Sequence, residues 1–103
     1  MNFKFPYRNY NPRELIRRAG YGENQDPNPT EISYARKLGQ GFYPRFHVYL
    51  KEFEKYFEVS LHLDQKQPSY GSEHAHSGEY DGDTVEDEAR RITQVIKDIY
   101  ETQ

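Results

Sequence analysis

The chain has 103 residues, which is enough for one domain and too few for two independent hydrophobic cores. It contains no cysteine, so disulfides and thiolate metal sites are excluded, and no apolar run approaches the length of a membrane span. The net charge is −3, but residues 1–51 hold nine basic and four acidic side chains, whereas residues 52–103 hold five and thirteen.

We expect a single domain over residues 1–103, with residues 1–10 flexible and polar loops at 20–30 and 65–82. The loops are rich in residues that form turns, such as glycine, proline and asparagine. The start of the chain has no uninterrupted apolar run of the kind found in signal peptides, so the sequence favours a cytoplasmic protein.

The first helix signal covers residues 11–20. Asn11 is a favourable N-cap, Pro12 suits the first helical position, and Gly20 can adopt the left-handed conformation that ends a helix. Residues 32–38 fit either a short helix or a strand, and the Gly-Gln-Gly turn that follows favours the strand.

The strongest pattern lies between residues 45 and 64, where two alternating segments predict an antiparallel hairpin. If Arg45 pairs with Asp64 and His47 with His62, apolar residues oppose apolar residues on the other face. A shift of one residue in either strand would move its apolar set to the wrong face, so a single register is specified.

A second helix is predicted from residue 83, with Asp83 as its cap and an apolar stripe at helical spacing that comprises Val85, Ala89, Ile92, Ile96 and Ile99. The element order is therefore helix, strand, strand, strand, helix. This order predicts an α+β fold in which a three-stranded antiparallel sheet carries both helices on one face.

If the helices cover one face of the sheet, the other face carries His47, His62 and Asp64. Side chains directly opposed on neighbouring strands have Cβ atoms about 4.5–5.5 Å apart, so the two imidazoles can share one ion. Imidazole and carboxylate ligands suit divalent Zn, Ni, Fe or Mn. His74 and His76 lie in the long loop and would complete the ligand set if that loop folds over the open face.

The sequence thus predicts a cluster of histidine and carboxylate groups that binds a divalent metal or a small polar ligand. Within it, His47 and Glu79 are the candidate catalytic groups, Glu79 as a base or an extra ligand. The alternative is an exposed cross-strand pair of His47 and His62, with the loop histidines in solvent. Whether the protein is an enzyme stays open.

A second prediction is RNA binding, because arginines interleaved with aromatic residues can contact phosphates and stack on bases. The candidate residues are Arg17, Arg18, Arg36 and Arg45. The alternative for these arginines is a solvated helix face.

A family resemblance points the same way. The element order, Leu-Ile-Arg-Arg-Ala-Gly-Tyr at residues 15–21 and His-Ser-Gly-Glu at residues 76–79 resemble HicA-type toxins. This resemblance implies the double-stranded-RNA-binding fold and cleavage of mRNA by a histidine on the sheet, for which His47 is the nearest candidate. A third prediction is a protein-interaction module or homodimer, in which an edge strand or an aromatic surface meets a partner.

Overall fold

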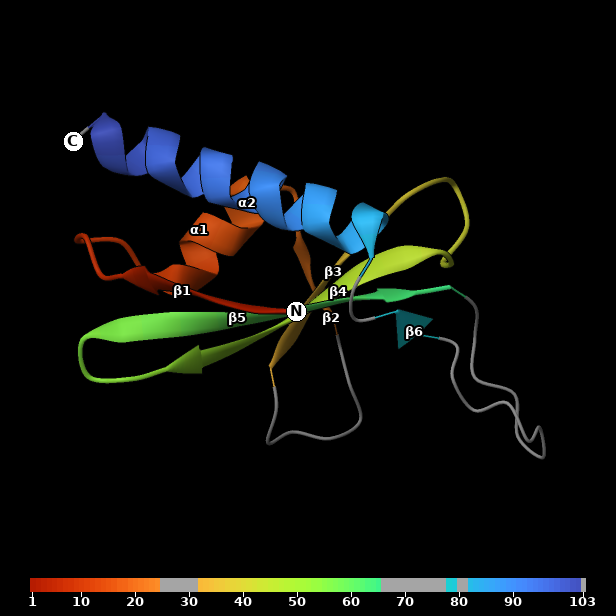
Figure 1. The fold of residues 1–103 in the computed structure, drawn as a ribbon, viewed down its shortest axis with the longest axis horizontal. Coiled ribbons are helices and arrows are strands. Elements are labelled where there is room, and N and C mark those ends of the chain that lie inside the picture. The colour runs from red at the N-terminus through yellow and green to blue at the C-terminus, as the bar shows by residue number, and fades with distance from the viewer. Residues whose placement is uncertain (25–31, 66–77, 80–81, 103) are drawn as a thin grey trace.

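The computed structural model describes residues 1–24, 32–65, 78–79 and 82–102. Five strands form one antiparallel sheet in the order β1-β5-β4-β3-β2, and both helices lie against the same face (Figure 1). A short strand, β6, pairs with the end of β5 beyond β1. The strands are β1 (Asn2–Pro6), β2 (Gly22–Asn24), β3 (Ser33–Lys37), β4 (Arg45–Glu52), β5 (Tyr56–Asp64) and β6 (Gly78–Glu79), and the helices are α1 (Pro12–Arg18) and α2 (Asp83–Glu101).

The α+β class agrees with the sequence, but the predicted three-stranded sheet is wrong. β1 lies in the segment expected to be flexible, β2 in the expected loop at 20–30, and β6 in the expected loop at 65–82. These strands are only two to five residues long, which is too short for periodicity to reveal. They form because a strand that is distant in the sequence has backbone groups with which they can pair, as β5 has for β1.

The predicted hairpin of β4 and β5 is confirmed residue by residue. Arg45 pairs with Asp64 and His47 with His62, and residues 53–55 form the connecting loop. The segment that fitted either a helix or a strand is β3, which pairs with β4. The alternation of apolar and polar residues in the sequence therefore predicted correctly which side chains of the hairpin lie on each face of the sheet.

The ends of the helices agree with the sequence in part. The Asn11 side chain accepts a hydrogen bond from the backbone N–H two residues on, and Pro12 is the first residue of α1. Gly20 follows the helix with a φ of +100°. At the start of α2 the predicted cap is wrong, because Gly82 occupies the N-cap position and no side chain caps the helix.

The hydrophobic core lies between the two helices and one face of the sheet. Its side chains come from alternate positions of the strands and from the apolar stripes of the helices, and they include Leu15, Ile16, Tyr34, Phe46, Val48, Phe57, Val59, Leu61, Leu63, Val85, Ile92 and Ile96. Because successive strand residues point to opposite faces, the residues between these on β4 and β5 point away from both helices.

A buried carboxylate joins the helices to each other. Glu88 of α2 is 4% exposed and accepts hydrogen bonds from Tyr21 Oη and Arg91 Nε, each at 2.6 Å. Arg91 also donates to the Ala19 carbonyl at 2.6 Å, which satisfies a free carbonyl where α1 ends. Burial, and next the hydrogen bond to Glu88, raise the pKa of Tyr21 well above its usual range.

Neither helix in the described ranges combines the length and the apolar character that a membrane span requires.

Candidate metal centre

The register of β4 and β5 places three potential metal ligands on the face that the helices leave bare. His47 lies directly opposite His62, and their ring centroids are 4.8 Å apart at an interplanar angle of 51°. Asp64 follows two residues after His62 and therefore points to the same side of the sheet. The hairpin alone is thus enough to bring the three side chains together.

The Asp64 carboxylate lies close to both imidazoles. Its Oδ1 is 3.1 Å from His62 Nε2, and its Oδ2 is 3.3 Å from His47 Nδ1. One ligand atom from each of the three residues lies within 4.8 Å of the other two. In a tetrahedral zinc site with bonds of about 2.0–2.1 Å, neighbouring ligand atoms are roughly 3.3 Å apart. The two separations that involve Asp64 are of this size, one from each of its oxygens.

The surroundings keep Asp64 ionised. Burial alone would raise the pKa of this carboxyl, but hydrogen bonds and charge from His47 and His62 outweigh burial and hold the pKa well below its usual range. Arg45 Nε also lies 3.3 Å from Oδ2, and its guanidinium packs over the ring of Tyr43 at 4.9 Å. Asp64 is therefore an anion at neutral pH, which is the form that binds a cation.

His47 is more enclosed than a residue on an open sheet face would be. Its side chain is 7% exposed, and its Nε2, the ring nitrogen that does not face Asp64, is buried with no hydrogen-bond partner among the described residues. The ring centroids of Tyr49 and His62 lie 4.7 and 4.8 Å from that of His47. A buried nitrogen without a partner is costly, and in native proteins it often marks a bound water or ion, or a catalytic role. The alternative prediction was a pair of histidines exposed to solvent. The pair is present, but its side chains are largely buried.

Not all of the predicted ligands join this cluster. His47, His62 and Asp64 come together, whereas His74 and His76 lie outside the described residues. Glu79 occupies the register position opposite Leu63, and it is Gly78 that pairs with Asp64. The described part of the chain therefore supplies three of the predicted ligands.

The four arginines considered for RNA binding do not form one surface. Arg17 and Arg18 lie on α1, and Arg36 reaches Glu88 on the helix side of the sheet, whereas Arg45 belongs to the opposite face. Each approaches a carboxylate, at the following distances: Arg17 to Glu23, 3.8 Å; Arg18 to Glu14, 2.9 Å; Arg36 to Glu88, 3.5 Å; and Arg45 to Asp64, 3.3 Å.

Sequence reasoning missed two features of this region. One is Tyr43, whose ring supports the Arg45 guanidinium and whose position two residues before Arg45 was the available signal. The other is Ser33, which is completely buried opposite Tyr49 and whose Oγ has no hydrogen-bond partner in the part of the chain that the structure describes. Nothing in the local pattern of β3 distinguishes a buried serine from an exposed one.

The chain matches no protein-family model, no curated protein and no solved structure.

Proposed function

We propose that the protein binds one divalent transition-metal ion, zinc in the first instance, through His47, His62 and Asp64. The observation that carries the proposal is the position of the Asp64 carboxylate, whose oxygens lie 3.1 and 3.3 Å from one nitrogen of each imidazole. Two imidazoles and one carboxylate form a ligand set that zinc, iron, nickel and manganese accept.

Three protein ligands leave at least one coordination position for water or a small polar ligand. A metal held in this way polarises whatever occupies that position. A small polar molecule can therefore bind to the site through the metal.

The test is isothermal titration calorimetry of the untagged protein with zinc, followed by nickel, iron(II) and manganese(II). We expect one equivalent of zinc to bind, with affinity at least tenfold weaker in His62→Ala and in Asp64→Ala. Glu58→Ala serves as the matched control, because it also removes a polar side chain from this face of β5 but leaves the proposed ligands intact.

Elemental analysis of protein purified without chelators gives an independent measurement. Metal-free protein that also shows no calorimetric response to any of the four ions would overturn the proposal. The cluster would then be a hydrogen-bond network in which Asp64 accepts from two histidines and from Arg45.

A further inference from the structure

A small cavity lies beside the metal centre, on the face of the sheet that the helices leave bare. Its volume is about 230 Å³, and its lining residues come from β2, β3, the start of β4 and the loop between β3 and β4. Gly22 and Ala35, which are paired on neighbouring strands, both line it. A Cβ at Gly22 would meet no atom within 4 Å, so the space above this residue is open. Ala35 is in turn paired with His47, which places the cavity one strand away from the metal ligands.

Two cationic side chains line this cavity. Lys37 and Arg45 are directly opposed on β3 and β4, so their Cβ atoms are about 4.5–5.5 Å apart and both side chains lie on the same face. The Arg45 side chain is 15% exposed, and its Nε donates to Asp64 at 3.3 Å. The other N–H groups of this guanidinium have no acceptor among the described residues. Arg45 can therefore donate to a ligand in the cavity while it keeps its contact with Asp64.

The charge of Lys37 is not neutralised by any carboxylate in the part of the chain that the structure describes. Its Nζ lies 4.3 Å from the ring centroid of Phe42 and forms no ion pair there. Glu23 also lines the cavity, but its side chain belongs to the helix side of the sheet, where its carboxylate lies 3.8 Å from Arg17 of α1. Two cations therefore stand against the single carboxylate of Asp64, and this balance favours an anion.

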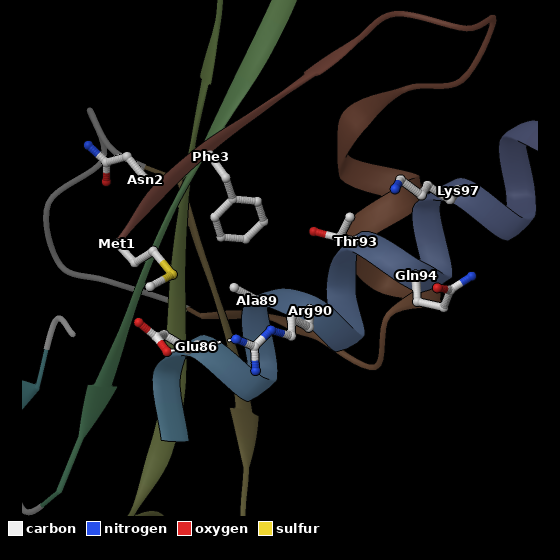
Figure 2. Close-up of a pocket in the computed structure, with 9 residues that line it drawn as sticks. All are labelled: Met1, Asn2, Phe3, Glu86, Ala89, Arg90, Thr93, Gln94 and Lys97. Carbon is white, nitrogen blue, oxygen red and sulfur yellow. Dashed lines mark ion pairs between the residues drawn. The ribbon is translucent and has the colours of Figure 1, made fainter. Parts of the chain in front are cut away.

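A larger cavity, of about 550 Å³ between β1 and α2, does not offer the same pair of charges (Figure 2). Its basic side chains are Arg90 and Lys97. Arg90 is paired with Glu86 at 3.9 Å, as the dashed line in Figure 2 marks, and with Asp87 at 3.1 Å. Lys97 is therefore a lysine at the rim of a cavity that lacks a second available cation, which makes it a control position for Lys37.

From these observations we propose that the cavity beside the metal centre binds the phosphate group of a small molecule, held between Lys37 and Arg45. A guanidinium donates two parallel hydrogen bonds to phosphate oxygens, and the lysine ammonium adds a point charge. A phosphate group, with a charge of about −1.5 to −2, matches two cations better than a carboxylate does. Phe42, which is 65% exposed at the rim, can contact the part of the ligand that carries the phosphate.

The experiment is an NMR titration of the untagged, metal-free protein with inorganic phosphate at low ionic strength. We expect saturable shifts of the backbone amides of Ala35, Lys37 and Arg45, and binding at least tenfold weaker for acetate. Because no metal is present, this result is independent of the outcome of the zinc titration. The absence of a saturable shift, or equal binding of phosphate and acetate, would overturn the proposal.

Variants locate the site. Lys37→Glu should weaken phosphate binding at least tenfold, whereas Lys97→Glu, with the same charge change at the cavity between β1 and α2, should leave it within twofold. Gly22→Leu should also weaken binding at least tenfold, because its side chain would fill the open space. Equal effects of the two lysine variants would contradict the site. Unchanged binding by Gly22→Leu would contradict it as well, because the anion would then lie outside the cavity.

Adenosine and adenosine monophosphate distinguish free phosphate from a phosphorylated ligand. We expect the nucleotide to bind at least as tightly as inorganic phosphate, and adenosine not to bind. A nucleotide affinity at least tenfold above that of phosphate would identify a phosphate monoester as the ligand, with Phe42 contacting the group attached to the phosphate. Equal affinities would identify free phosphate. Adenosine that binds as tightly as the nucleotide would overturn the proposal, because the phosphate would then contribute nothing.

Discussion

His47 and His62 face each other across β4 and β5 with their ring centroids 4.8 Å apart, on the side of the sheet that carries no helix. The Asp64 carboxylate reaches both rings, so three ligands of one potential site come from two consecutive strands. A site built in this way depends on the register of one hairpin and on the fold that supports the hairpin.

Asp64→Asn keeps the shape of the side chain and removes its negative charge. We expect the affinity for zinc to fall at least tenfold, about 1.4 kcal/mol, because the anionic ligand is lost. Glu58→Gln is the control, since Glu58 lies on the same strand and on the same face without joining the cluster. Calorimetry of both variants checks this prediction, and equal affinities for zinc would contradict it.

Acidification should weaken the binding of zinc. Imidazole binds metal only in its neutral form, and histidines generally take up protons as the pH falls from about 7.5 to 5.5. Asp64 stays ionised over this range because its pKa lies below its usual value, so protonation of this carboxylate does not contribute to the loss. The rise in Tm that zinc produces should therefore shrink with falling pH. A shift in Tm that is constant with pH would argue against histidine ligands.

Glu88→Gln tests the buried carboxylate between the helices. Glu88 accepts from both Tyr21 and Arg91, so removing its charge should lower the free energy of unfolding by roughly 1–3 kcal/mol. Glu86→Gln, two residues earlier at an exposed position, should change it by about 0.5 kcal/mol or less. Urea unfolding followed by circular dichroism measures both values. Similar values for the two variants would mean that the network contributes little.

Gly20→Ala tests the end of α1. A Cβ at Gly20 would lie 3.5 Å from Arg36 atoms, which is ordinary contact, so the cost arises from the φ of +100°. We expect a loss of about 1–2 kcal/mol in the free energy of unfolding. The matched control is Gly39→Ala, where a Cβ meets no atom within 4 Å and no left-handed φ is required. Thermal unfolding of the two variants should differ accordingly, and equal stabilities would contradict the conformational argument.

Local sequence patterns were sufficient for several parts of the fold. The alternation in residues 45–64 specified the register that pairs His47 with His62, because a slip of one residue would expose an entire apolar set. The cap at Asn11 and the glycine at residue 20 likewise marked the ends of α1, since each acts on backbone groups only a few residues away.

Other features depended on contacts between distant segments. β1 is a strand because the free edge of β5 accepts it, which five residues of sequence cannot reveal. The helical stripe of α2 was predicted as apolar, yet Glu88 lies within it because Tyr21 and Arg91 satisfy its oxygens. Periodicity determines which face of a strand or helix a side chain occupies, whereas burial on that face depends on what the rest of the chain places against it. For the same reason, the pattern placed His47 on the correct face, and only the assembled structure shows that the ring is enclosed with an unpaired nitrogen.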